Sequence, residues 1–308
     1  MRVLVVGAGA VGGYFGALLA RGGHDVAFVA RGTNLSALRT QGLRVELGRE
    51  TIRLAKPAAV ENPAEAPPPD LVLVCVKSYD TAGVAAALRP AVRPETIVLS
   101  LQNGVENEDV LASVLGLPPL MLALTQIGVA LTAPGVVEFS GRGNIVFGEP
   151  DGHESERART AHAALVQAAI PAEIRADIRV AVWEKLAWNA GFNAVTTITR
   201  TTVAQVLALP ATRELVIAGM EEVDAVATAL GVPVRRRRTA RVVEDSISAL
   251  PGFQTSMLQD LLRGRRLEYD AITGAAIRAA DRAGVAVPVN RALYALLARL
   301  DPPNRPPA

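Results

Sequence analysis

The sequence predicts an α/β protein with a parallel-sheet domain over residues 1–150 and an all-α domain over residues 151–308. Three observations lead to this fold class. Short, β-branched apolar runs alternate with helical segments in the first half of the chain. A glycine-rich turn follows the first of these runs. Beyond residue 150, apolar residues recur at three- and four-residue spacing, as in amphipathic helices. With 308 residues, 50% of them hydrophobic, the chain is long enough to form two cores.

The predicted elements follow this division. Brief continuous apolar runs are typical of strands buried on both faces of a parallel sheet, and four are found at Val3–Val6, Val26–Val29, Leu71–Val76 and Ile97–Leu101. Helical segments lie between or after them at Val11–Arg21, Thr81–Leu88 and Glu106–Leu115. Further strands are expected in a hairpin at Leu43–Leu54 and at Leu120–Gln126, Val136–Phe139, Asn144–Phe147 and Ala172–Ile174. The segment Glu149–Gly152 is the candidate linker.

Composition excludes several classes of protein. A single cysteine rules out a disulfide framework and a cysteine-rich zinc site, three histidines lack metal-ligand spacing, and we therefore expect no metal. Prolines interrupt the apolar stretch Leu117–Val137, so no membrane span is expected. The net charge is +2, and the basic run Arg235–Arg238 has no interleaved aromatics. A helix start or salt-bridging face explains that run better than nucleic-acid binding. We expect a cytoplasmic protein.

The glycine-rich turn predicts a dinucleotide site of the Rossmann type. Its residues follow the first strand, open a helix and match GxGxxG: Gly7, Ala8, Gly9, Ala10, Val11 and Gly12. The first glycine permits the tight turn, the second lets the backbone approach a pyrophosphate, and the third lets helix and strand pack closely. The N-terminus of the helix then offers unpaired N–H groups to the phosphates.

Residues at later strand ends favour NADPH and extend the site. Arg31 follows the second strand, where an enzyme using NAD would place an acidic residue for the ribose 2′-hydroxyl. A guanidinium there suits a 2′-phosphate, although a solvated surface arginine is the alternative. Lys77 and Asn103 follow the next two strands. Ligands of open parallel sheets bind beyond the carboxyl ends of the strands, which makes both residues candidates.

A polar stripe marks the helical half. Lys185, Asn189 and Asn193 are spaced four residues apart, so a helix would place them on one face among apolar neighbours. Polar side chains that are buried among apolar residues need hydrogen-bond partners. Those partners are either a bound ligand or each other, in a buried hydrogen-bond seam between helices.

A second cluster follows about seventy residues later. Ser256 is a plausible N-cap of a helix that Gly264 ends. Glu268 and Asp270 would open the next helix, where carboxylates favour the helix dipole. That structural role alone would account for either residue.

Taken together, these residues resemble the ketopantoate reductase (2-dehydropantoate 2-reductase) family. The resemblance covers nearly the whole chain and lies in an ordered set of motifs: Gly7–Gly12, Val76-Lys77, Asn103-Gly104, Trp183–Asn193, Ser256–Asp260 and Glu268–Asp270. It implies a Rossmann domain followed by a helical domain like that of 6-phosphogluconate dehydrogenase. The implied reaction is NADPH-dependent reduction of 2-dehydropantoate to pantoate, on the route to pantothenate and coenzyme A.

The resemblance also implies roles for individual residues. Lys185 would be the general acid that protonates the ketone oxygen as hydride reaches the ketone carbon, and Glu268 would position substrate and support this lysine. Arginine could not replace Lys185, because it holds its proton too tightly. Asn103 would lie where nicotinamide and substrate meet. Asn189, Asn193 and Ser256 would hold substrate, Lys77 would line the cleft, and Arg31 would read the 2′-phosphate.

Departures from the family pattern leave alternatives open. Thr273-Gly274 stands where many relatives have Asn-Gly, and Asp80 stands where relatives often have Gln. A paralogue that reduces another branched 2-oxo acid is therefore one alternative. A non-catalytic NADP(H) sensor is another, although it would not need Lys185. Homodimerisation is also open, because the helical domains pair in some relatives and not in others.

Overall fold

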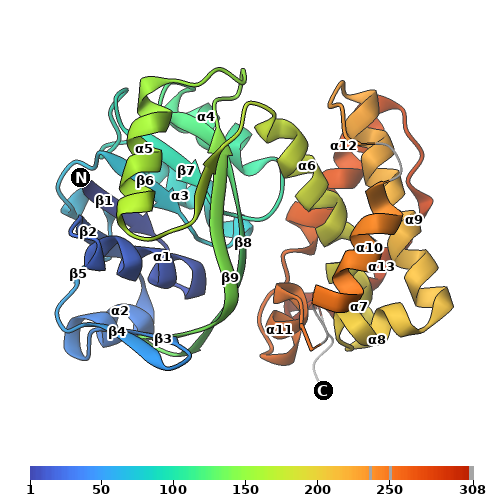
Figure 1. The fold of residues 1–308 in the computed structure, drawn as a ribbon, viewed down its shortest axis with the longest axis horizontal. Coiled ribbons are helices and arrows are strands. Elements are labelled where there is room, and N and C mark those ends of the chain that lie inside the picture. The colour runs from blue at the N-terminus through green and yellow to red at the C-terminus, as the bar shows by residue number, and fades with distance from the viewer. Residues whose placement is uncertain (236–237, 250–251, 305–308) are drawn as a thin grey trace. The chain divides into compact units, whose positions relative to one another are not determined.

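Strands and helices alternate along the first half of the chain, and helices fill the second (Figure 1). The computed structural model describes residues 1–235, 238–249 and 252–304. The chain forms two compact units. Unit 1 comprises Met1–Gln102 and Asn107–Ile178, and unit 2 comprises Asn103–Glu106 and Arg179–Ala308. Residues 151–178, which the sequence placed with the second domain, thus lie in unit 1.

Unit 1 is built on one mixed sheet. The order of its strands is β4-β3-β9-β8-β7-β6-β1-β2-β5, and β10 pairs with β9. The strands are β1 (Arg2–Val6), β2 (Asp25–Val29), β3 (Leu43–Leu47), β4 (Glu50–Leu54), β5 (Ala58–Val60), β6 (Leu71–Val74), β7 (Ile97–Ser100), β8 (Leu120–Ala133), β9 (Val136–Gly148) and β10 (Ala172–Ile174). The five strands from β5 to β7 are parallel, which confirms the predicted parallel sheet.

Helices cover both faces of this sheet. They are α1 (Ala10–Arg21), α2 (Gly32–Thr40), α3 (Thr81–Leu88), α4 (Asn107–Leu115) and α5 (Glu156–Gln167), with 3-10 turns η1 (Pro63–Glu65) and η2 (Ser78–Asp80). Alternate strand residues point to opposite faces. Val5 and Leu73 pack in the core beneath α1, α2 and α5, whereas Leu4 and Val74 pack in a second core beneath α3 and α4. Burial on both faces explains why the strand sequences are continuously apolar.

The long hairpin β8–β9 differs from the prediction. The sequence suggested separate strands at Val136–Phe139 and Asn144–Phe147, yet both belong to β9. Gly141, with a φ of +115°, lies at a register shift of the ladder, so the glycine there marks a bulge within one strand.

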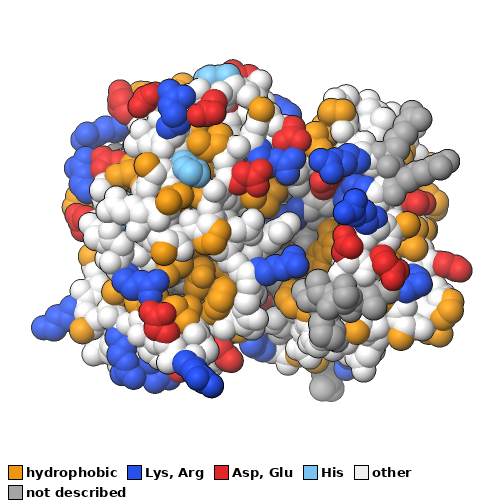
Figure 2. Space-filling model, in the orientation of Figure 1, with side chains coloured by type: hydrophobic (Ala, Val, Ile, Leu, Met, Phe, Trp, Pro, Cys, Tyr) orange, Lys and Arg blue, Asp and Glu red, His pale blue; other side chains and the backbone are white. Residues whose placement is uncertain are grey.

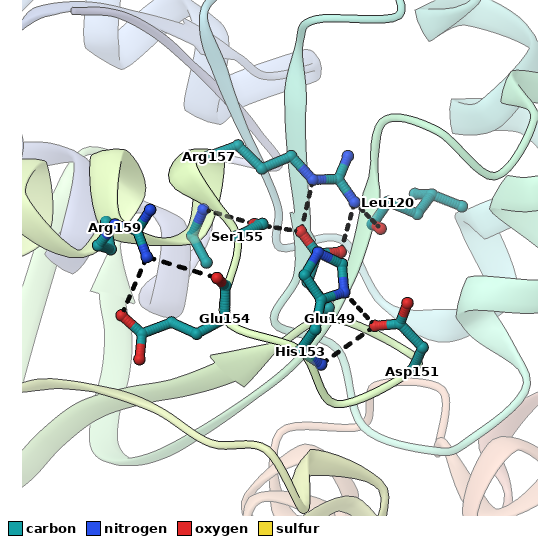
Figure 3. A network of polar contacts seen from close by, with 9 residues as sticks. Leu120, Glu149, Asp151, His153, Glu154, Ser155, Arg157 and Arg159 are labelled. Atoms are coloured by element: carbon teal, nitrogen blue, oxygen red, sulfur yellow. Dashed lines mark hydrogen bonds and ion pairs between the residues drawn. The ribbon is translucent and has the colours of Figure 1, made fainter.

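The predicted linker is an anchored turn of unit 1 (Figure 3). The carboxylate of Glu149 is buried and accepts hydrogen bonds from Ser155 Oγ at 2.5 Å and from Arg157 Nε at 2.7 Å. Arg157 also donates to the carbonyls of Pro118 and Leu120. Burial alone would raise the pKa of Glu149, but the hydrogen bonds from Arg157 and Ser155 hold this pKa below its usual value.

The regular elements of unit 2 are all helical in the residues described. Its helices are α6 (Ile178–Trp188), which begins on the last residue of unit 1, α7 (Ala194–Thr199), α8 (Val203–Ala208), α9 (Pro210–Ala229), α10 (Arg238–Ala249), α11 (Ser256–Leu262), α12 (Ala275–Ala283) and α13 (Pro288–Leu300). Two π-helical turns, η3 (Asn189–Asn193) and η4 (Asp270–Gly274), and the 3-10 turn η5 (Pro302–Asn304) complete it. A core of its own includes Leu186, Phe192, Met220 and Leu293.

The basic run at Arg235–Arg238 is partly described, since Arg236 and Arg237 lie outside the described residues. Arg238 begins α10 and pairs with Asp224, with Nη2 and Oδ1 2.7 Å apart, and with Glu184 at 3.7 Å. On the face that Figure 2 shows, basic and acidic side chains are interspersed. For Arg238 the salt-bridging interpretation is therefore confirmed.

Candidate active site

The carboxyl ends of four parallel strands form one row in unit 1. Val29, Val6, Val74 and Ser100 are paired in that order across β2, β1, β6 and β7. The segments that follow these residues therefore emerge along one edge of the sheet, where open α/β sheets bind ligands. They carry Gly7–Gly12, Arg31 and Lys77, so the structure brings these predicted cofactor residues to the same edge.

The glycine turn has the geometry that its sequence predicts. Gly7 has a φ of +98°, and a Cβ there would lie 2.7 Å from Val76 Cγ1. A Cβ on Gly12 would lie 2.2 Å from the carbonyl oxygen of Gly7, so helix and turn meet too closely for a side chain. A Cβ on Gly9 meets nothing within 4 Å. No side chain caps the N-terminus of α1 at Gly9, which leaves its first N–H groups available to phosphate oxygens. The turn therefore fits a dinucleotide pyrophosphate.

Asn34 holds this turn and was not among the predicted site residues. Its Nδ2 donates to the carbonyl of Ala8 at 2.7 Å, and its Oδ1 accepts from the backbone N–H of Gly135 at 2.8 Å. The N–H groups of Gly7 and Ala8 both donate to the carbonyl of Val29. One amide therefore ties the glycine turn to the β8–β9 connection. The sequence around Asn34, three residues after Arg31, does not indicate this contact.

Arg31 is exposed at the N-cap position of α2, directly beyond β2. The position and exposure of Arg31 are compatible with a contact to a ribose 2′-phosphate, which stays a prediction.

A buried network fixes the segments after β6 and β7. Gln102 is 7% exposed, and its Nε2 donates to the carbonyl of Val76 at 3.0 Å and to Thr81 Oγ1 at 2.8 Å. Thr81 in turn donates to Oδ1 of Asn107 at 3.0 Å. The half-buried Lys77 directly follows Val76 in this network. The sequence marked Gln102 only as a polar residue beyond a strand end, so its bridging role is a finding of the structure.

In unit 2, the expected helical stripe changes its geometry. Lys185 lies in the last turn of α6, but Asn189 and Asn193 lie in η3, so the prediction of one α-helical stripe is wrong beyond Trp188. Within η3, Gly191 packs so closely on α9 that a Cβ would lie 2.8 Å from the carbonyl oxygen of Val216. Spacing by four residues cannot reveal such a turn, whose hydrogen bonds span five.

Two buried polar atoms near η3 lack hydrogen-bond partners among the described residues. They are Nδ2 of Asn193, whose residue is 2% exposed, and Oγ1 of Thr197, whose residue is fully buried. Buried polar groups are nearly always satisfied in native proteins. A seam in which the stripe residues satisfy each other therefore does not account for Nδ2 of Asn193.

Glu268 and Ser256 lie at the starts of helical segments. Glu268 is 6% exposed and precedes η4, and η4 contacts η3. Ser256 is the exposed first residue of α11, but the predicted N-cap is wrong, because Thr255 caps this helix and hydrogen-bonds Thr196 at 2.8 Å. Gly264 follows α11 with a φ of +66°, which confirms the predicted stop. Asn103 is half-buried and belongs to unit 2 with these residues.

The described residues contain neither a candidate metal site nor a candidate membrane span. No group of three or more His, Cys, Asp or Glu side chains could hold a metal ion. Nor does any helix in that part of the chain have the length and apolar character needed to cross a membrane.

Comparison with known proteins gives matches over nearly the whole chain. The family model described as "Ketopantoate reductase PanE/ApbA" matches residues 3–152, and that described as "Ketopantoate reductase PanE/ApbA C terminal" matches residues 177–301. The chain is 37% identical to a 2-dehydropantoate 2-reductase of Archaeoglobus fulgidus, covering 96% of each chain. It is 34% identical to that of Halobacterium salinarum, covering 96% of this chain and 98% of the relative. A solved 2-dehydropantoate 2-reductase from Geobacter metallireducens GS-15 has a TM-score of 0.91 at 33% identity, covering 96% of this chain and 99% of that one.

Proposed function

The chain belongs to the ketopantoate reductase family, and from this premise we propose that it reduces 2-dehydropantoate to pantoate with NADPH, a step in pantothenate biosynthesis. The observation that carries the proposal beyond family membership is the buried, unpartnered amide nitrogen of Asn193, two helical turns after Lys185. A donor there suits the oxygens of a small 2-oxo acid.

Unit 1 supplies the residues that would hold the cofactor. The turn from Gly7 to Gly12 and the uncapped start of α1 suit the pyrophosphate, and Arg31 suits the 2′-phosphate. We assign Lys77 to the nicotinamide end of the site, together with Asn103, which belongs to unit 2. When bound, NADPH supplies the hydride that the ketone carbon receives.

Unit 2 supplies the residues that would act on substrate. Lys185 donates a proton to the substrate oxygen, which gains negative charge as the ketone becomes an alcohol. Glu268 holds Lys185 and the substrate in place. Asn103, Asn189, Asn193 and Ser256 bind the hydroxyl and carboxylate groups of the substrate. The predicted division is a cofactor-binding region at residues 1–150 and a substrate and catalytic region at residues 151–308, with Asn103 contributing to both tasks.

Loss of the proton donor tests this mechanism. We expect Lys185→Ala to lower kcat by roughly 10²–10⁴-fold, the usual contribution of a positioned acid, while NADPH still binds. Lys56→Ala is the matched control, because Lys56 is exposed and has no predicted role. The measurement is the loss of NADPH absorbance with ketopantoate. Equal activity of the two variants would refute the role of Lys185.

A second substrate deserves a test because of Thr273. This residue replaces the asparagine of many relatives, is fully buried, and its Oγ1 has no hydrogen-bond partner among the described residues. A changed polar group in η4, which contacts η3, favours a different branched 2-oxo acid as the alternative substrate. A panel of 2-oxo acids distinguishes the two, since the true substrate has the highest kcat/KM. Binding of NADPH without turnover of any acid would instead indicate a sensor.

Location and assembly belong to the same proposal. A reductase of small acids that uses NADPH is expected in the cytoplasm, with no membrane or nucleic-acid partner. Pairing through the helical unit is the expected mode if the enzyme is a homodimer. Light scattering on the purified protein gives the mass that decides between monomer and dimer.

A further inference from the structure

The segment Asn103–Glu106 belongs to unit 2, although its neighbours Gln102 and Asn107 belong to unit 1. Two contacts hold it there. Val105 packs against the apolar core of unit 2, and the carboxylate of Glu106 pairs with Arg278 of α12. Gly104, with a φ of +108°, provides the backbone turn between Asn103 and these anchors. The anchors therefore fix the position from which Asn103 reaches the site.

Arg278 joins this segment to the start of η4 with all three of its guanidinium nitrogens. Nε and Nη2 donate to Glu106 Oε2 at 3.1 and 2.7 Å. Nη1 donates to Asp270 Oδ1 at 3.0 Å, and Nη2 also donates to the Asp270 carbonyl at 3.0 Å. Asp270 lies two residues after Glu268. One planar group thus spans the segment that carries Asn103 and the turn that carries Glu268.

Neighbouring groups complete this arrangement. Tyr294 donates its hydroxyl to Asp270 Oδ1 at 3.0 Å, and Arg282 lies 3.7 Å from Glu106. Gly274 leaves the necessary room, since a Cβ there would lie 2.6 Å from Asp270 Oδ1 and 3.1 Å from Arg278 Nη1. A side chain at this position would require the Asp270 carboxylate to shift.

We propose that Arg278 is a positioning residue, whose bonds to Glu106 and Asp270 set the places of Asn103 and Glu268 in the active site. The inference rests on the proposed function for the roles of Asn103 and Glu268. Lysine cannot substitute, because an ammonium group is a point charge that cannot make this planar, three-way set of bonds.

Steady-state kinetics of three variants tests the proposal. We expect Arg278→Ala and Arg278→Lys each to lower kcat/KM for ketopantoate by about 10-fold or more, with NADPH affinity changed by less than about 3-fold. Arg291→Ala is the matched control, since it breaks the exposed Arg291–Asp281 pair at the far end of α12 and should stay within about 2-fold of wild type. Full activity of Arg278→Lys would overturn the proposal, because charge alone would then suffice.

A double variant separates positioning from general stability. Because Arg278 would also position Glu268, adding Arg278→Ala to Asn103→Ala should still lower kcat/KM, but by a smaller factor than Arg278→Ala lowers it in the wild-type background. A further loss equal to that of the single variant would show that Arg278 does not act through Asn103.

Hydrogen exchange tests the same contact without any substrate. In Arg278→Lys and Arg278→Ala, amides of residues 103–106 and 268–274 should exchange about 10-fold faster than in wild type, and Arg291→Ala should leave them unchanged. Unchanged exchange in both Arg278 variants would overturn the proposal. If wild type does not turn over ketopantoate, the proposed function fails, and this experiment still decides whether Arg278 holds the two segments.

Discussion

At the scale of the residue, we propose that Arg31 distinguishes between two cofactors that differ by one phosphate. Its guanidinium is exposed at the start of α2 and has no acidic neighbour within the first turn of that helix. A charge-assisted hydrogen bond to a phosphate contributes about 1.5–3 kcal/mol, or roughly 10–100-fold in affinity. We therefore expect Arg31→Ala to weaken NADPH binding by that factor and NADH binding by less than about 2-fold, as measured by fluorescence titration.

The control for Arg31 lies on the same helix. Arg39 is also exposed, but its Nε donates to the backbone carbonyl of Ala59, so Arg39→Ala should affect the two cofactors equally. Equal weakening of NADPH and NADH by Arg31→Ala would contradict the assignment of the 2′-phosphate to Arg31.

Other residues show where inference from sequence stops. Gly7 and Gly12 were predictable, because a glycine pattern reports a backbone requirement that is local. Asn34 was not, since its partners Ala8 and Gly135 are distant in sequence and no local pattern around Asn34 indicates these contacts. The bonds of Arg278 to Glu106 and Asp270 were equally hidden, because nothing in the sequence distinguishes Arg278 from the other 28 arginines of the chain. Residue roles that depend on tertiary contacts need the structure.

At the scale of the element, local patterns predicted strands and helices well but missed irregular turns. Continuous apolar runs identified β1, β2, β6 and β7 to within two residues, because burial on both faces leaves a clear pattern. The π-turn η3 was missed, since its sequence continues the helical spacing and only the close packing of Gly191 on α9 distinguishes it.

The turn between β9 and α5 yields a prediction for stability. Glu149 is buried with Arg157 and Ser155, and its pKa lies below the usual value despite burial. Such a carboxylate stabilises the folded state above its unfolded pKa, and this contribution is lost as the pH falls through the folded pKa. Arg157 is partly exposed, so we expect Glu149→Gln to cost about 1–3 kcal/mol at neutral pH.

Urea unfolding at several pH values checks the Glu149 prediction. The difference between wild type and Glu149→Gln should shrink as the pH falls below the unfolded pKa of glutamate. Glu154→Gln is the control, because Glu154 lies on the same turn with an exposed carboxylate, 3.5 Å from Arg159. A difference for Glu149→Gln that stays constant down to acid pH would contradict the linkage.

At the scale of the whole molecule, the order of domains was predictable and their borders were not. Alternation of strand and helix followed by helices alone indicated a sheet unit and a helical unit. The assignment of Asn103–Glu106 to unit 2 depends on contacts of Val105 and Glu106 that lie more than seventy residues away in sequence. No local pattern carries that information.

Separate cores predict that the two units respond differently to the cofactor. The apolar clusters beneath the helices of unit 1 share no member with the cluster around Phe192 in unit 2. Both tryptophans, Trp183 and Trp188, lie in unit 2, so their fluorescence reports on that unit, whereas far-ultraviolet circular dichroism reports on both.

NADPH at a hundred times its Kd should stabilise the unit that binds it by about 2.7 kcal/mol. In urea we therefore expect NADPH to move the transition seen by circular dichroism more than that seen by fluorescence. Arg31→Ala should reduce this shift at the same NADPH concentration, because it weakens binding. Coincident transitions that move together would instead show that the two units unfold as one cooperative whole.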